Sequence, residues 1–89
     1  MNINHIDRYR LIGRKIAYYR QTRSWSQQRL SDEAGVSLSY LSKIEAPNST
    51  KTYSLDVLFT IADALQIEPY ILLLTDKENE LKKTTTYHK

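Results

Sequence analysis

The chain has 89 residues, which suffice for one hydrophobic core but not for two, so one site or one surface carries its function. Apolar residues make up 40% of the sequence and charged residues 26%, a balance typical of a folded globular protein rather than a disordered one. The absence of cysteine excludes disulfides and thiolate zinc sites, and the two histidines, His5 and His88, offer almost no material for a metal site or a catalytic triad. We therefore expect no metal and no cofactor.

Two features bear on the location of the protein. The longest apolar run, Tyr70–Leu74, is far shorter than the roughly 20 residues that span a bilayer. The first seven residues lack the basic and then apolar order of a signal peptide. We expect a cytoplasmic protein without a membrane partner.

The net charge of +3 conceals a segregation along the chain. Residues 8–51 carry nine basic and three acidic side chains, whereas residues 52–76 carry four acidic side chains and no lysine or arginine. This asymmetry suggests that the first half of the chain contacts a polyanion and that the second half does something else. The alternative is an ordinary solvated face.

Five helices and no strand are predicted from the periodicity of apolar residues and from the capping signals. The first helix spans about residues 7–22, with Ile12, Ile16 and Tyr19 on one apolar stripe. Gly13 lies inside this helix and disfavours it by about 1 kcal/mol relative to alanine. We therefore expect close packing against another element at that glycine.

Two shorter helices follow. The first covers residues 27–34, with Ser26 as its N-cap, and Gly35 directly after it can take the left-handed backbone that ends a helix. Ser37 caps the next helix, which ends near Glu45. The chain therefore turns sharply between two capped helices.

The fourth helix is capped by Ser54 and has a strong helical period of apolar residues. Those residues are Leu55, Leu58, Ile61, Ala62 and Leu65. Pro69 opens a short fifth helix that contains Ile71–Leu74. We expect one domain over residues 1–76, with its core over about residues 12–74, and a polar tail over residues 77–89 that extends the last helix partway and then frays.

Residues 26–45 contain two capped helices of about eight residues, joined by a tight turn through one glycine. The apolar residues placed to pack between these helices are Leu30, Ala34, Val36, Leu41 and Ile44. This pattern is typical of a helix-turn-helix, whose second helix enters the major groove of DNA. The alternative is a helical hairpin that serves only the core.

The sequence resembles the lambda-repressor-like family, which is the Cro/repressor or xenobiotic-response-element type of helix-turn-helix domain. The resemblance rests on Ile16, Arg20, Trp25-Ser26-Gln27, Leu30, Ala34-Gly35-Val36-Ser37, Tyr40-Leu41-Ser42-Lys43-Ile44-Glu45, Leu58, Ile61-Ala62 and Ala64-Leu65. It implies an all-α, compact five-helix domain that binds operator DNA, usually as a homodimer, and regulates transcription.

The chain departs from the family pattern at three places. Ser24 stands where the family often has glycine, Ala46-Pro47 replaces a glycine-containing turn, and Gln28-Arg29 replaces acidic residues. The last change adds positive charge beside the expected DNA surface. The change in the turn leaves the path of the following loop open.

The third predicted helix supplies the expected base contacts. At 100° per residue, Leu41 and Ile44 face the core, so the opposite face carries Ser39, Ser42 and Lys43, with Leu38 at its rim. The hydroxyls can donate to or accept from base edges, Lys43 can donate to guanine, and Leu38 can contact a thymine methyl. Because these side chains are few and mostly short, we expect part of the specificity to come through water or DNA shape. The alternative is plain solvent exposure.

Phosphate contacts are expected around this helix. Gln27 lies in the first turn of its helix, where an amide and the helix dipole favour a phosphate oxygen, and the resemblance points to the same contact. The alternative for Gln27 is a local capping or surface role. Gln28 is expected to contact phosphate as well and to support the phosphate contact of Gln27. The further candidates are Arg14, Arg23, Arg29, Ser37, Tyr40, Asn48, Thr50 and Lys51. The resemblance also implies that Arg20 and Glu45 pair across two helices in a structural role.

The apolar residues after Pro69 exceed what one short helix needs inside the protein, which suggests a self-association surface formed by Tyr70, Leu72, Leu73 and Leu74. A two-fold dimer places two recognition helices about one DNA turn apart and favours a palindromic site. The alternative is complete burial of the leucines in the core.

Three function classes can be compared. The favoured hypothesis is a sequence-specific regulator that binds double-stranded DNA as a homodimer, without a small-molecule ligand. The alternative is a protein-interaction module, such as an antitoxin or an adaptor, with a toxin or a polymerase as its partner. An enzyme is not expected, because the sequence has no convergent set of titratable groups and no glycine-rich phosphate loop.

Overall fold

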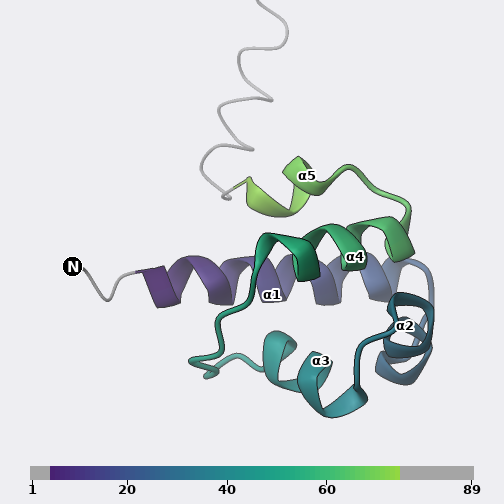
Figure 1. The fold of residues 1–89 in the computed structure, drawn as a ribbon, viewed down its shortest axis with the longest axis horizontal. Helices are drawn as coiled ribbons and strands as arrows, with labels where there is room; N and C mark the ends of the chain where they lie inside the picture. Colours follow the sequence, from purple (N-terminus) through teal and green to yellow (C-terminus); the bar gives the residue numbers. More distant parts are fainter. Residues whose placement is uncertain (1–4, 75–89) are drawn as a thin grey trace, which may run out of the picture.

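The computed structural model describes residues 5–74, which form five helices and no strand (Figure 1). The helices are α1 (His5–Thr22), α2 (Gln27–Ala34), α3 (Leu38–Glu45), α4 (Leu55–Leu65) and α5 (Pro69–Leu73). In the view of Figure 1, α4 crosses in front of the long α1, α5 lies above them, and α2 and α3 lie below. The predicted all-α, five-helix architecture is confirmed. None of the described helices is long and apolar enough to cross a membrane.

Serine caps define three helix starts. The side chains of Ser26, Ser37 and Ser54 each accept a hydrogen bond from the backbone N–H three residues further on, at 3.0, 3.0 and 3.2 Å. Gly35 ends α2 with a left-handed backbone of φ 72°, as predicted. Gln66 ends α4 in the same region with φ 60°, although it is not a glycine. These caps satisfy terminal backbone groups that the helices leave unpaired.

The departures from the family pattern have local structural explanations. Ser24 adopts a left-handed backbone with φ 57°, the region that glycine enters without steric penalty. Ala46 ends α3 in an extended conformation with φ −65°, so this turn needs no glycine. The loop after α3 therefore leaves the helix through Ala46 without a left-handed residue.

Two predicted boundaries are wrong. Helix α1 begins at His5 rather than near residue 7, because no proline or glycine interrupts the helical pattern there. Helix α5 ends at Leu73, and Leu74 has an extended backbone with ψ 134°, so this helix does not contain Leu74. A five-residue helix makes few internal hydrogen bonds, so tertiary contacts decide where it ends. The predicted boundary near residue 76 and the tail 77–89 lie outside the described residues.

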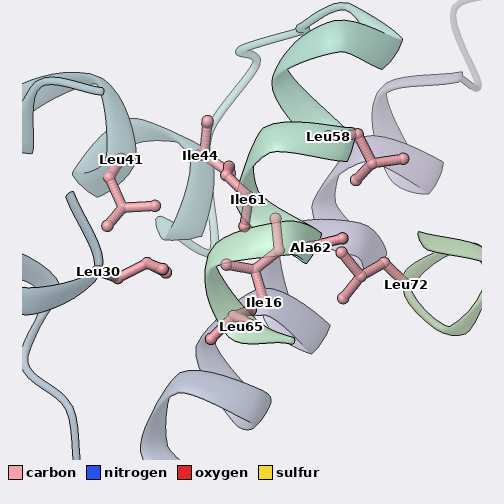
Figure 2. Close-up of a cluster of buried hydrophobic side chains, with 9 residues drawn as sticks. All are labelled: Ile16, Leu30, Leu41, Ile44, Leu58, Ile61, Ala62, Leu65 and Leu72. Carbon is pink, nitrogen blue, oxygen red and sulfur yellow. The ribbon is translucent and has the colours of Figure 1, made fainter. Parts of the chain in front are cut away.

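One hydrophobic core joins all five helices (Figure 2). Its buried members are Ile16, Leu30, Leu41, Ile44, Leu58, Ile61, Ala62, Leu65 and Leu72. The predicted close packing at Gly13 is confirmed: a Cβ at this position would collide with the backbone carbonyl oxygen of Ile44. The absence of a side chain at Gly13 therefore lets α1 contact the backbone of α3 directly.

Candidate nucleic-acid interface

Helices α2 and α3 form a rigid pair joined by a three-residue turn. Leu30, Leu41 and Ile44 are buried between them, and Ala34 and Val36 pack against the core at its edge. This arrangement is the predicted helix-turn-helix. Because its inner face is fixed by the core, the outer face of α3 has a defined orientation.

The outer face of α3 carries the residues expected to contact bases. Ser39 and Lys43 are exposed and have no hydrogen-bond or ion-pair partner among the described residues. Leu38 is 40% exposed and lies at the rim of this face. Ser42 differs from them because it is half-buried. Three of the four predicted base-contacting residues are therefore available at the surface.

Arg20 and Glu45 form an ion pair between α1 and the end of α3. The guanidinium donates from Nε to Oε2 and from Nη2 to Oε1 of the carboxylate, both at 2.9 Å. Its Nη1 also donates to the backbone carbonyl of Trp25 at 2.6 Å. The side chains are only 11% and 4% exposed, so this pair lies largely out of water. It ties α3, the expected recognition helix, to α1, as the resemblance implied.

The same carboxylate orients Gln27. The Nε2 of Gln27 donates to Oε1 of Glu45 at 2.9 Å, and the Oγ of Ser42 donates to Oε1 of Gln27 at 2.8 Å. The side chain of Gln27 therefore has a local structural role, and its second amide proton and backbone N–H stay available for a phosphate. The contact between Gln27 and Ser42 was not predicted, because no local sequence signal relates the start of α2 to the middle of α3.

Two other residues of α2 are engaged locally. The Nε2 of Gln28 donates to Asp32 Oδ1 at 2.9 Å, one helical turn further on, rather than to Gln27. Arg29 pairs with Glu33 at 3.0 Å, and its guanidinium lies 4.4 Å from the ring centre of Trp25. The added charge of Arg29 is thus partly balanced within the helix.

The remaining phosphate candidates have different surroundings. Arg14 is exposed and makes no ion pair among the described residues, whereas Arg23 donates from Nη1 to the carbonyl of Tyr19 at 3.1 Å. Ser37 is the cap of α3 and is exposed. Asn48 and Thr50 are exposed in the loop after α3.

Tyr40 and Lys51 face each other across this loop. The Nζ of Lys51 lies 4.8 Å from the ring centre of the half-buried Tyr40, within cation–π range. The contact places the ammonium group of the loop beside the recognition helix. These two predicted phosphate contacts therefore share one location.

The loop after α3 is anchored to α1 at two points that the sequence analysis missed. Arg10 donates from Nε to the backbone carbonyl of Ser49 at 2.7 Å, and the hydroxyl of Tyr53 donates to the carbonyl of Tyr9 at 3.2 Å. The rings of Tyr9 and Tyr53 also meet edge to face at 5.0 Å. Burial, with smaller contributions from nearby tyrosines, raises the pKa of Tyr53 above its usual value and keeps its hydroxyl a donor.

The surface around α5 carries the predicted self-association residues, with one correction. Leu72 is fully buried in the core of the single chain and is not a surface residue, because the short helix directs it between α1 and α4. Tyr70 and Leu73 are 54% and 47% exposed, and Leu74 is half-buried.

Two further apolar side chains on α4 were not predicted to be exposed. Leu55 and Phe59 are 59% and 43% exposed, one helical turn apart. Leu55 and Leu73 line an open cavity of about 570 Å³ between α1, α4 and α5. The acidic second half of the chain therefore has an apolar surface of its own.

Comparisons with known proteins agree with this geometry. A family model described as helix-turn-helix matches residues 16–72. Two curated relatives, the HTH-type transcriptional regulators SinR of Bacillus licheniformis and of Bacillus subtilis (strain 168), are each 34% identical over 70 residues, which is 79% of this chain and 62% of the relative. The chain thus spans less than two thirds of the length of these relatives. The crystal structure of a hypothetical transcription factor, NHTF from Neisseria, superposes with a TM-score of 0.74 and 25% identity over 82% of both chains.

Proposed function

Because the chain belongs to the Cro/repressor-type helix-turn-helix family, we propose that it is a sequence-specific, double-stranded-DNA-binding regulator of transcription. The observation that carries this proposal is the two-sided recognition helix. Its inner face is fixed by Leu41 and Ile44 in the core, and its outer face exposes Ser39 and Lys43, which have no partners within residues 5–74. A helix held in this way can enter the major groove without reorganising.

The phosphate contacts of the proposal surround α3. Gln27 contributes its second amide proton, and Lys51 contributes its ammonium group beside Tyr40. The other contributors are Arg14, Arg23, Arg29, Ser37, Asn48 and Thr50. Phosphate contacts fix the register of the protein on the duplex, while the base contacts determine the sequence.

We propose further that the protein binds as a homodimer on a palindromic operator. The exposed Tyr70 and Leu73 of α5, with the half-buried Leu74 directly after the helix, form the self-association surface. A two-fold dimer presents the same surface from both copies and sets two recognition helices about 34 Å apart, one turn of DNA.

Selection of bound duplexes from a random pool at about 150 mM salt, followed by a salt titration on the enriched sequence, tests the proposal. Enrichment of a palindrome with half-sites about ten base pairs apart supports a dimeric, specific regulator. Enrichment of a single half-site supports the regulator and contradicts the dimer. If no sequence is enriched and affinity only falls with salt, the basic residues around α3 bind DNA without sequence specificity, and the proposal fails.

A second candidate function, a protein-interaction module such as an antitoxin or an adaptor, is favoured by Leu55 and Phe59. These side chains expose apolar surface on α4, outside the helix-turn-helix. Replacing both with serine distinguishes the two functions. A regulator keeps its affinity for the enriched duplex, whereas a protein-interaction module loses binding to its protein partner.

A further inference from the structure

The hydrogen bonds behind the recognition helix have a fixed direction. Both oxygens of Glu45 face the guanidinium of Arg20, and an ionised carboxylate only accepts hydrogen bonds. The amide of Gln27, 2.9 Å from the same carboxylate, must therefore turn its NH₂ group toward Glu45. Its oxygen then faces α3, and this orientation follows from the charge of the neighbour.

Ser42 is the next member of this chain of hydrogen bonds, after Arg20, Glu45 and Gln27. Its Oγ lies 2.8 Å from the oxygen of the Gln27 amide, which has no proton to offer, so the hydroxyl of Ser42 is the donor. A serine hydroxyl has one proton and two acceptor lone pairs. Once the proton is used internally, the side chain can only accept hydrogen bonds from anything outside.

Ser39 on the same helix is a natural comparison. It is exposed and has no intramolecular hydrogen bond among the described residues. Its hydroxyl can rotate to donate or to accept. Two serines of one recognition helix therefore differ in what they can recognise, although their side chains are chemically identical.

We propose that Ser42 is a specificity-determining residue that accepts a hydrogen bond from an exocyclic amino group in the major groove, with its polarity set by the series Arg20–Glu45–Gln27. In the major groove only adenine N6 and cytosine N4 donate, whereas guanine O6 and N7 and thymine O4 accept. Ser42 therefore favours adenine or cytosine at the position it faces and rejects an acceptor there. This inference rests on the proposed DNA-binding function.

The first experiment removes the amino group from the DNA. In the duplex selected by the wild-type protein, each adenine is replaced in turn by purine and each cytosine by 2-pyrimidinone, which lack N6 and N4 amino groups. The wild-type protein loses affinity about 3- to 10-fold at one position of the half-site, the range of one net hydrogen bond. The Ser42→Ala protein no longer distinguishes the two duplexes at that position.

The matched variant is Ser39→Ala, which removes a hydroxyl from the same helix. It changes the preference at a different base pair and leaves the amino-group dependence assigned to Ser42 intact. Ser42→Ala proteins that keep the full amino-group dependence at every position overturn the inference. A Ser42-dependent position that responds instead to 7-deazaguanine, which lacks the N7 acceptor, also overturns it.

The second experiment tests the origin of the polarity. Gln27→Ala removes the acceptor of the Ser42 proton and lets the hydroxyl donate. Affinity then falls on all duplexes, because a phosphate contact is lost. In addition, the preference for an amino group over an acceptor at the base that faces Ser42 falls from about 10-fold to about 2-fold. A uniform loss of affinity with the preference unchanged contradicts the role of Gln27.

The failure of this inference is distinguishable from the failure of the proposed function. If the wild-type protein enriches no sequence, DNA recognition itself is absent. If the wild-type and Ser42→Ala proteins enrich the same sequence with the same discrimination, only the role of Ser42 is wrong. Thermal unfolding of each variant confirms that the proteins compared are folded.

Discussion

The guanidinium of Arg10, in the first half of α1, holds the backbone of Ser49 in the loop after the recognition helix, at 2.7 Å between Nε and the carbonyl oxygen. The two residues are 39 positions apart. Together with the bond from Tyr53 to Tyr9, this hydrogen bond joins α1 to the loop that presents Asn48, Thr50 and Lys51. The loop is thereby ordered before any partner binds, which lowers the entropy lost on binding.

Arg10→Met is therefore expected to weaken DNA binding by more than the removal of one positive charge alone would. We expect affinity for the enriched duplex to fall about 3- to 10-fold beyond the effect of Arg8→Met, an exposed arginine of the same helix. Binding titrations at two salt concentrations provide the measurement. Equal losses for the two variants would mean that the anchor to Ser49 does not contribute.

Breaking the pair of Arg20 and Glu45 has a large effect on stability. Arg20→Met leaves a carboxylate that is 4% exposed without its cation, and the free energy of unfolding falls by about 3–5 kcal/mol. Arg29→Gln, which breaks the exposed pair with Glu33, lowers it by about 1 kcal/mol or less. Urea unfolding of both variants gives the comparison. Similar losses for the two pairs contradict the structural role of Arg20.

Gly13→Ala is destabilising even though alanine favours a helix by about 1 kcal/mol over glycine. The new Cβ collides with the carbonyl of Ile44, so α1 and α3 must separate, and we expect a net loss of about 1–3 kcal/mol. In Gly35→Ala the new Cβ meets no atom within 4 Å, so the only cost is the strain that alanine acquires at φ 72°, about 1–2 kcal/mol. If Gly13→Ala raises the melting temperature, the two helices are not in backbone contact.

Leu72 and Leu73 are neighbours with opposite roles. Leu72→Ala opens a cavity in the core and lowers the free energy of unfolding by about 2–5 kcal/mol. Leu73→Lys places a charge on the proposed self-association surface, so it shifts the mass measured by light scattering toward the monomer with little change in unfolding. A Leu73→Lys protein with unchanged mass would remove Leu73 from the dimer interface.

Alkaline pH tests the buried hydroxyl of Tyr53. Its pKa is raised in the folded protein above the ordinary 10.0, so above pH 10 the unfolded chain loses this proton first and unfolding is favoured. Stability is fully present below pH 10 and falls above it, by up to about 1.4 kcal/mol per pH unit. Urea unfolding of Tyr53→Phe between pH 8 and about 11, with Tyr18→Phe as the control, is expected to show a flatter fall in stability with pH. At neutral pH the free energy of unfolding of Tyr53→Phe is lower by about 1 kcal/mol, because the hydrogen bond to Tyr9 is lost. An unchanged slope in Tyr53→Phe contradicts the assignment.

Local signals in the sequence were sufficient for the helices and for most of their ends. The apolar period places one face of each helix in the core, and Ser26, Ser37 and Ser54 bond to backbone groups only three residues away. Such interactions depend on nearby residues, so they are readable along the chain. The outward face of α3 was predicted from Leu41 and Ile44 for the same reason.

Only the tertiary structure decided how side chains distant in sequence share their hydrogen bonds and their burial. The run after Pro69 does not show which leucine faces inward, because Leu72 is buried only where α1 and α4 enclose it. The direction of the bond from Ser42 to Gln27 depends on Glu45, which belongs to a different helix from Gln27 and owes its own place to Arg20. These relations arise when helices pack, and packing brings together residues that no local pattern connects.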